Sequence, residues 1–171
     1  MPKRKRKEDL RPTFNYNGEP VRAGGCLFYV NVNNEIYYLL RKGKRDWGDI
    51  GGKTDEKDTC INDTIIREVV EETNNVLLNE THDMEEAIKS LTYIINNTSK
   101  KIFYSNKSKY MLFVIELPSE IYYMDNKRFG LKEHTDGWTM NHYYSWISKK
   151  KINRNLLHAR LRFHKDFSKI F

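Results

Sequence analysis

The sequence is poor in cysteine and has no long apolar run. Two cysteines, Cys26 and Cys60, are too few for a disulfide framework in a chain of 171 residues. No apolar segment approaches the roughly 20 residues of a membrane span, and the first residues are basic rather than apolar. We therefore expect no membrane span and no secretory signal, and we expect both cysteines to be buried thiols in a cytoplasmic protein.

Positive charge exceeds negative charge along the chain. The 30 lysines and arginines outnumber the 23 acidic residues, which leaves a formal net charge of +7. Such a balance suits a polyanionic substrate, although many small proteins are basic for solubility alone. Residues 3–7 read KRKRK and cannot pack together, so residues 1–17 are expected to form a disordered tail. This tail could contact RNA, direct nuclear entry or be merely solvated, and residues 18–171 are expected to form one domain.

Three glutamates are spaced to share one face of a helix. Residues 51–75 read GGKTDEKDTCINDTIIREVVEETNN, with Glu68, Glu71 and Glu72 at positions i, i+3 and i+4. Like charges this close destabilise a bare helix, so something must offset their repulsion. Carboxylate oxygens are the ligands that hard divalent cations prefer. The spacing therefore predicts a Mg²⁺ or Mn²⁺ site, the alternative being a solvated acidic helix face.

The residues around the glutamates support a helix with defined ends. Thr59 or Asp58 can cap its start, and Asn74 or Asn75 can adopt the left-handed conformation that ends it. The residues expected to face a core are Cys60, Thr64, Ile65, Val69 and Val76. Upstream, the pair Gly51–Gly52 lets the backbone approach a ligand or the helix closely.

This stretch resembles the Nudix box, written G-x5-E-x7-R-E-U-x-E-E-x-G-U with U aliphatic. The residues that match its charged core in type and spacing are Arg67, Glu68, Glu71 and Glu72. Gly52 takes the first position, Asp58 stands where the motif has glutamate, and one extra residue separates Gly52 from Arg67. Asn74 and Asn75 replace the final glycine and aliphatic residue.

The resemblance implies an α+β fold, the Nudix α/β/α sandwich with a mixed central sheet, and metal-dependent hydrolysis of a diphosphate linkage. Glu68, Glu71, Glu72, the Gly51 carbonyl and Glu133 are the implied metal ligands. Arg67 is expected to orient a carboxylate of the box by a bidentate pair. The general base is implied to be Glu68 or Glu133, and Glu116 and Glu120 are alternatives to Glu133 as the carboxylate outside the box.

Hydrophobic patterning predicts the elements around the box. Strands are expected at 21–32 and 35–42, joined by a turn at Asn33–Asn34, and at 76–78, 101–104 and 110–117. Apolar residues recur at helical spacing over 83–97, which predicts a helix. The resemblance to the Nudix family implies that this helix is inserted into the minimal fold. A C-terminal helix is expected over 155–171.

The substrate must be recognised outside the box. Candidate contacts to phosphates or bases are Lys42, Lys44, Arg45, Trp47, Lys53, Phe129 and Tyr143, with Trp138 as a further aromatic. Abundant Asn, Ile, Lys and Tyr resemble proteins from AT-rich genomes, including large DNA viruses that carry mRNA-decapping Nudix enzymes. We therefore expect capped RNA as substrate, with m7GDP released in the host cytoplasm. The alternatives are diphosphoinositol polyphosphates, dinucleoside polyphosphates, or a catalytically weak RNA-binding module.

Overall fold

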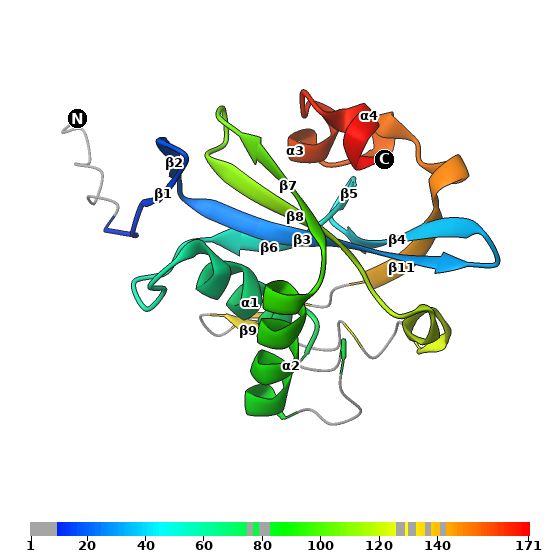
Figure 1. Ribbon diagram of the computed structural model, residues 1–171, viewed down its shortest axis with the longest axis horizontal. Helices are drawn as coiled ribbons and strands as arrows, with labels where there is room; N and C mark the ends of the chain where they lie inside the picture. The colour runs from blue at the N-terminus through cyan, green and yellow to red at the C-terminus, as the bar shows by residue number, and fades with distance from the viewer. Residues whose placement is uncertain are drawn as a thin grey trace.

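One mixed β-sheet lies between two layers of helix (Figure 1). The computed structural model describes residues 10–74, 77–78, 83–125, 129, 133–135, 138–140 and 143–171. Helices α1 (Ile61–Glu72) and α2 (Met84–Asn97) lie on one side of the sheet, and the short helices α3 (Ala159–Arg162) and α4 (Phe167–Ile170) lie on the other. The fold is therefore α+β, with the α/β/α layering that the sequence predicted.

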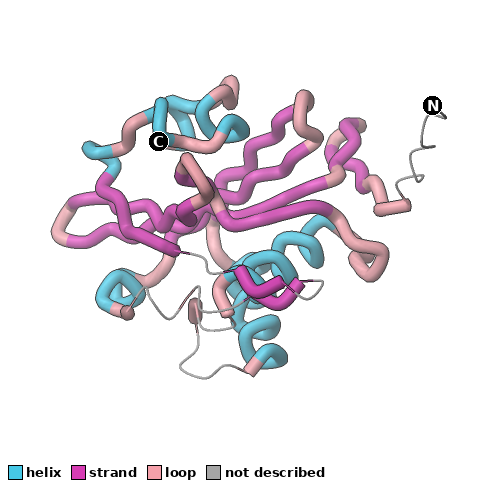
Figure 2. Tube along the Cα trace, turned by 180° about the vertical axis from the view of Figure 1, so that it is seen from behind, coloured by secondary structure: helices cyan, strands magenta, loops and turns pink. Residues whose placement is uncertain are grey.

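The sheet runs in the order β11-β4-β3-β8-β7, and β5 and β6 extend it beside β4 and β3. These strands are β3 (Ala23–Val32), β4 (Glu35–Lys42), β5 (Trp47–Gly48), β6 (Ile50–Lys53), β7 (Lys100–Ser105), β8 (Tyr110–Glu116) and β11 (Tyr143–Ser148). Strands β3 and β8 are parallel, whereas the other pairs are antiparallel, so the predicted mixed sheet is confirmed. The sheet is also seen from behind in Figure 2.

The hairpin between β3 and β4 is confirmed at its predicted turn. Asn33 and Asn34 have φ angles of 51° and 61°, both in the left-handed region. Asparagine tolerates this region better than most residues, and two successive left-handed residues match the twist of a tight hairpin. The turn therefore fixes the register of the two strands that lead into the box.

Each face of the sheet covers its own apolar core. Along β3 the alternation of side chains sends Phe28 and Val30 toward α1 and α2, and Leu27 toward the C-terminal helices. Ile65 and Val69 of α1 are fully buried in the first core. Thus α1 is held against the sheet by its apolar face, which turns its glutamates toward β6.

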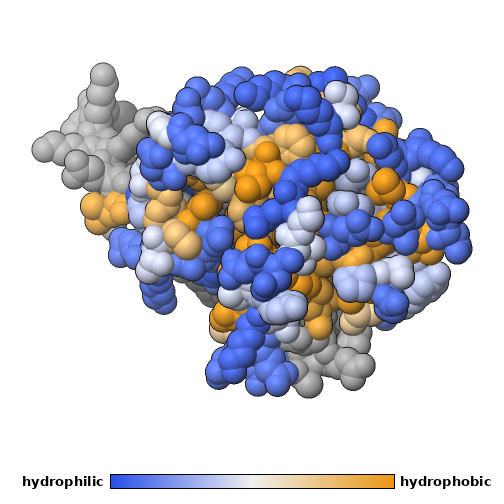
Figure 3. All heavy atoms as spheres, viewed as in Figure 1, coloured by the Kyte–Doolittle hydropathy of each residue, from blue (hydrophilic) through white to orange (hydrophobic). Residues whose placement is uncertain are grey.

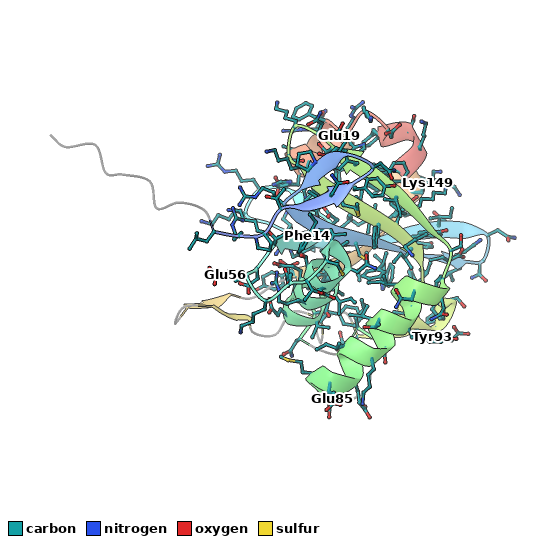
Figure 4. All side chains as sticks on the ribbon, turned by 60° about the vertical axis from the view of Figure 1, so that its left-hand side comes forward. Phe14, Glu19, Glu56, Glu85, Tyr93 and Lys149 are labelled. Carbon is teal, nitrogen blue, oxygen red and sulfur yellow. The ribbon has the colours of Figure 1, made fainter. Side chains whose placement is uncertain are left out.

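Helix α2 confirms the helix predicted over 83–97. The side chain of Asp83 accepts hydrogen bonds from the second and third amides beyond it and so caps the helix. Ala87, Leu91 and Ile95 recur every four residues and are buried. Tyr93 projects away from the sheet (Figure 4) and is 68% exposed. Helix α2 therefore packs along one apolar stripe.

The prediction of one continuous helix over 155–171 is wrong, because the structure has two short helices there. A 3-10 turn at Arg154–Leu156 precedes α3, and residues 163–166 separate α3 from α4. His158 caps α3, and the Nδ1 atom of His164 accepts a hydrogen bond from the amide of Asp166 between the helices. The chain breaks because its buried residues must follow the sheet: they are Leu157, Leu161, Ile170 and Phe171.

Several boundaries also differ from the sequence-based expectation. Within the supposed tail, β1 (Phe14–Tyr16) pairs with β2 (Glu19–Val21), and Phe14 packs against the core (Figure 4). Leu77 and Leu78 form a bend rather than a strand. A 3-10 helix occupies Ser119–Tyr123, another occupies Lys149–Lys151, and β9 (Glu133–Thr135) pairs with β10 (Trp138–Met140).

The two cysteines lie in different environments. Cys26 is fully buried on β3, where burial raises the pKa of its thiol, whereas Cys60 is exposed. Cys60 is also the N-cap residue of α1, in place of the predicted Thr59 or Asp58. The prediction that both thiols are buried is therefore wrong for Cys60. No helix in the described part of the chain is long and apolar enough to span a membrane.

Candidate functional site

The glycine pair Gly51–Gly52 lies in β6, between strand β3 and helix α1. In the antiparallel register Gly51 is opposite Gly25, and Gly52 is opposite Gly24. A Cβ atom at Gly51 would collide with the backbone of both β3 glycines, and one at Gly52 would collide with the carboxylate of Glu68. Because glycine has no Cβ, the backbone of β6 can touch the first glutamate of the acidic helix.

Arg67 gathers the carboxylates of the motif. Its Nε and Nη2 atoms donate to the two carboxylate oxygens of Asp58, both at 3.1 Å. Its Nη1 atom donates to Glu68 Oε1 at 2.9 Å and to Glu71 Oε2 at 3.3 Å, and Nη2 also donates to the carbonyl of Lys53 at 2.9 Å. The predicted bidentate pair is confirmed, and the carboxylate it orients is that of Asp58.

Asp58 closes the loop that precedes α1. Its side chain is buried and also accepts hydrogen bonds from the amide of Asp55 and the hydroxyl of Thr64, both at 2.7 Å. Burial raises the pKa of Asp58, but the hydrogen bonds from Arg67, Asp55 and Thr64 outweigh it and hold the pKa below its usual value. The Asp58 carboxylate is thus an ionised anchor for Arg67.

Glu72 joins α1 to three strands. The amide of Gly51 donates to Glu72 Oε2 at 3.1 Å, and Arg41 of β4 forms an ion pair with Oε1. The Tyr144 hydroxyl of β11 donates to the carbonyl of Glu72 at 2.8 Å. The residue is only 5% exposed, so its carboxylate works inside the structure as a link between β4, β6 and α1.

The carboxylates of Glu68, Glu71 and Glu72 are of the type that binds hard cations. In this structure, however, the three do not point to one common position. Glu68 and Glu71 reach the same Arg67 nitrogen, and their side chains are 14% and 39% exposed. Glu72 is held by Arg41 instead. No group of three His, Cys, Asp or Glu residues placed to hold a metal ion occurs among the described residues. The oxygen pair of Glu68 and Glu71 therefore fits Mg²⁺ or Mn²⁺, whereas the Glu72 carboxylate already has Arg41 and the Gly51 amide as partners.

Three of the predicted substrate contacts lie next to one another on the sheet. Lys42 is opposite Tyr143 on one side and Trp47 on the other, and its Nζ atom lies 4.8 Å from the centre of the Trp47 ring. Residues opposite one another in an antiparallel sheet point to the same face. Their neighbours Arg41 and Tyr144 reach Glu72, so the Lys42 cluster points to the opposite face from the glutamates.

The remaining basic candidates occupy exposed loops. Lys44 and Arg45 lie in the turn between β4 and β5, and the exposed Lys53 ends β6 beside Arg67. Trp47 is half-buried against the C-terminal segment, and its carbonyl accepts a hydrogen bond from the amide of His158 at 2.7 Å. Trp47 therefore contributes to packing, while Lys53 is the predicted lysine nearest the motif.

The prediction that Phe129 stacks on a base is wrong. Its side chain is fully buried in the core beneath the sheet and meets the ring of Tyr144 edge-on, with centroids 6.2 Å apart. A buried ring cannot stack on a base, so Phe129 is a core residue. Tyr143 is 66% exposed and stays accessible. The side chain of Trp138 lies outside what the structure describes.

The carboxylate expected from outside the box is placed only in part. The backbone of Glu133 lies in β9, and its side chain lies outside the described residues. Glu116 accepts a hydrogen bond from Tyr29 at the far end of β8. Four residues of strand, about 13 Å, separate Glu116 from the level of Gly25, which argues against Glu116 as a ligand at the motif.

Four charged or polar residues of the site were missed by sequence reasoning. Arg41 pairs with Glu72, and Asp49, Tyr110 and Arg160 form a buried cluster behind β6. Arg41 could have been found only by knowing which face of β4 covers α1, because its neighbour Lys42 is as basic. A buried Asp49 gave no signal, since aspartate beside glycine is usual in a turn.

Comparison with solved structures finds distant structural likeness. No protein-family model and no curated protein matches the chain. A crystal structure of a C. elegans Ap4A hydrolase binary complex aligns with a TM-score of 0.40 at 15% identity, covering 73% of this chain and 78% of that one. A further C. elegans Ap4A hydrolase structure gives a TM-score of 0.37 at 16% identity, covering 74% and 80%. What this chain does must therefore follow from its own residues.

Proposed function

We propose that the protein is a divalent-metal-dependent hydrolase that cleaves a diphosphate linkage. The observation that carries this proposal is the contact of Arg67 with Asp58, Glu68 and Glu71 beside Gly51, where a Cβ atom would collide with the backbone of β3. An acidic face that was merely solvated would not need a buried aspartate to anchor its arginine. The arrangement instead holds two carboxylates in fixed positions, as catalysis on a charged substrate requires.

The residues of the chain divide the work of this reaction. A bound Mg²⁺ or Mn²⁺ would stabilise charge on the phosphate oxygens and lower the pKa of the attacking water. Glu68 and Glu71, which share one Arg67 nitrogen, would hold the cation. The resemblance to the Nudix box implies the Gly51 carbonyl as a further backbone ligand. Arg67 fixes the two carboxylates rather than contacting the substrate. Glu68 or Glu133 would take the proton from water as it attacks phosphorus and the bond to the leaving phosphate breaks.

Capped RNA is the substrate that we propose within this class, with m7GDP as the product. The net charge of +7 and the exposed Lys44, Arg45 and Lys53 favour a polyanion over a small neutral molecule. Hydrophilic side chains also cover much of the rim around the C-terminal helices (Figure 3). Tyr143 beside Lys42 offers an exposed ring and a cation, the pair of groups that hold single-stranded RNA.

The assay compares four substrates with Mg²⁺ or Mn²⁺ present: cap-labelled RNA, free cap analogue, a dinucleoside tetraphosphate and a diphosphoinositol polyphosphate. Release of labelled m7GDP from long RNA but not from free cap supports decapping. Turnover of the small molecules alone rejects decapping and retains the diphosphate hydrolase. Binding of RNA without turnover of any substrate rejects the enzyme and leaves an RNA-binding module.

Replacing Glu71 tests the proposed chemistry directly. Glu71→Gln keeps the size of the side chain and removes a charged oxygen ligand, so we expect metal-dependent turnover to fall about 10²-fold or more. Glu86→Gln, at an exposed acidic position on α2, is the matched control and should keep wild-type turnover. Near-native turnover by Glu71→Gln under saturating Mg²⁺ would contradict the assignment.

A further inference from the structure

A second polar cluster lies behind β6, on the side away from α1. Asp49 is fully buried between β5 and β6. Arg160 of α3 donates from Nε to Asp49 Oδ1 at 2.7 Å and from Nη2 to the Asp49 carbonyl at 3.1 Å, and the hydroxyl of Tyr110 donates to Oδ2. The Arg160 guanidinium also lies 4.5 Å from the centre of the Tyr110 ring. Each Asp49 carboxylate oxygen thus has a donor.

The cluster is poorly explained by stability alone. Taking a carboxylate and a guanidinium out of water costs free energy that a hydrophobic pair of the same volume would not. The cluster instead fixes the position of Asp49, because its two carboxylate oxygens and its backbone carbonyl all accept hydrogen bonds.

The cluster touches the glycine pair of the candidate site. A Cβ atom at Gly51 would lie 2.5 Å from the Tyr110 hydroxyl, and one at Gly25 would lie 2.9 Å from Asp49 Oδ2. On its other side, the amide of Gly51 donates to Glu72. The Gly51 backbone therefore lies between the Tyr110 hydroxyl on one side and Glu72 of α1 on the other.

We propose that Asp49, Tyr110 and Arg160 are positioning residues for the metal site: they fix the Gly51 backbone against α1 and so set the position of its carbonyl. This rests on the proposed function, because the fixed carbonyl matters to chemistry only as a ligand beside Glu68 and Glu71. The C-terminal segment then contributes to the site from the opposite face of the sheet, without touching the substrate. Loss of a group that orients metal ligands typically weakens metal affinity about 10- to 100-fold.

The test uses a variant that removes both charges of the Asp49–Arg160 pair together. Asp49→Asn/Arg160→Met leaves no unpaired ion, so we expect the melting temperature to stay within a few degrees of wild type. Mn²⁺ affinity, followed by electron paramagnetic resonance of free Mn²⁺ without substrate, should fall about 10-fold or more. Amide hydrogen exchange at Gly51 should accelerate at least about 10-fold, while exchange in β7 and β8 stays slow.

Two further proteins make the outcome decisive. Tyr110→Phe keeps the ion pair and removes one donor, so it should shift Gly51 exchange and Mn²⁺ affinity in the same direction by a smaller factor, even where the double variant does not fold. Glu85→Gln/Lys89→Met removes an exposed ion pair of α2 and should change neither quantity. Unchanged Gly51 exchange and Mn²⁺ affinity in the Asp49 and Tyr110 variants would overturn the proposal. Wild-type protein that binds no Mn²⁺ would overturn the proposed function, with Gly51 exchange still deciding the structural claim.

Discussion

Asp58 is one methylene shorter than the glutamate that the motif has at its position, and the loop around it is one residue longer. The structure shows how these two departures offset each other. The amide of Asp58 bonds to the carbonyl of Asp55 in a tight turn, and this turn brings the shorter side chain within 3.1 Å of two Arg67 nitrogens. The irregular half of the motif thus retains its arginine anchor.

The lowered pKa of Asp58 makes stability depend on acid. A carboxyl whose pKa is lower in the folded than in the unfolded state stabilises the fold above about pH 4, and this stabilisation is lost as the pH falls through the folded value. We expect Asp58→Asn to lower the free energy of unfolding at pH 7 by about 1–3 kcal/mol. The variant should also show a flatter dependence of the urea midpoint on pH between about 2 and 5.

Glu56 provides the control for this prediction. It is an exposed carboxylate in the same loop and projects from the surface (Figure 4). Glu56→Gln should leave the urea midpoint nearly unchanged at pH 7 and retain the wild-type slope with pH. Equal slopes for wild type and Asp58→Asn would show that Asp58 does not carry this acid dependence.

The sequence could not predict every contact of the site, and the missed contacts involve Arg41, Asp49 and Arg160. The spacing of Glu68, Glu71 and Glu72 is local, so it could be read directly from the chain. The partners of Asp49 and Glu72 come from residues 111 and 31 positions away, and nothing in the local sequence specifies these contacts. Lys42 and Arg41 were chemically equivalent until the pairing of β4 and β11 set which of them faces α1.

At the scale of elements, α2 has one well-packed apolar face. Leu91 is 2% exposed and belongs to the core that also holds α1. We expect Leu91→Ala to lower the free energy of unfolding by about 2–5 kcal/mol, measured by urea denaturation, because it removes buried methyl groups and leaves a cavity. Tyr93→Ala on the exposed side of the helix should cost less than about 1 kcal/mol.

The prediction of α2 was confirmed and the prediction of one continuous C-terminal helix was wrong for the same physical reason. Periodicity over 83–97 places a continuous stripe on one helix, and Asp83 caps it, so local and tertiary preferences agree. Residues 155–171 have apolar residues at mixed spacings, and packing on the sheet selects two short helices instead. A loss of cooperativity in Leu91→Ala unfolding would indicate that α2 folds apart from the sheet.

For the whole molecule, the mixed sheet was implied by the resemblance to the Nudix box, whereas the placement of the recognition residues was not predicted. Alternation along β4 sends successive basic residues to opposite faces, so Lys42, Trp47 and Tyr143 lie away from the glutamates. The capped RNA that we propose as substrate would be held by this net charge through many weak phosphate contacts. The candidate recognition surface is thus distributed over both faces of the sheet.

The basic residues near the N-terminus give a test of this charge effect. Deleting residues 1–7 should weaken binding of single-stranded capped RNA and flatten the plot of log affinity against log salt concentration by about 0.7 for each phosphate that the segment neutralises. Fluorescence anisotropy at several KCl concentrations measures both quantities. A chain with Lys3, Lys5 and Lys7 replaced by glutamine keeps the length and should give part of the effect. An unchanged salt slope would return this segment to a merely solvated role.

The pairing of Asp49 with Arg160 has a consequence for how the protein is made. During synthesis, Gly51 and the acidic helix leave the ribosome long before Arg160 and before β11, the strand that pairs with β4. Until then the nascent chain carries a carboxylate destined for burial with no cation to accompany it. Such long-range pairings also slow folding, because the entropy cost of closing a long loop must be met before the stabilising contacts can form. Assembly of the candidate site is therefore expected to be a late event, completed by the segment that lies on the far side of the sheet.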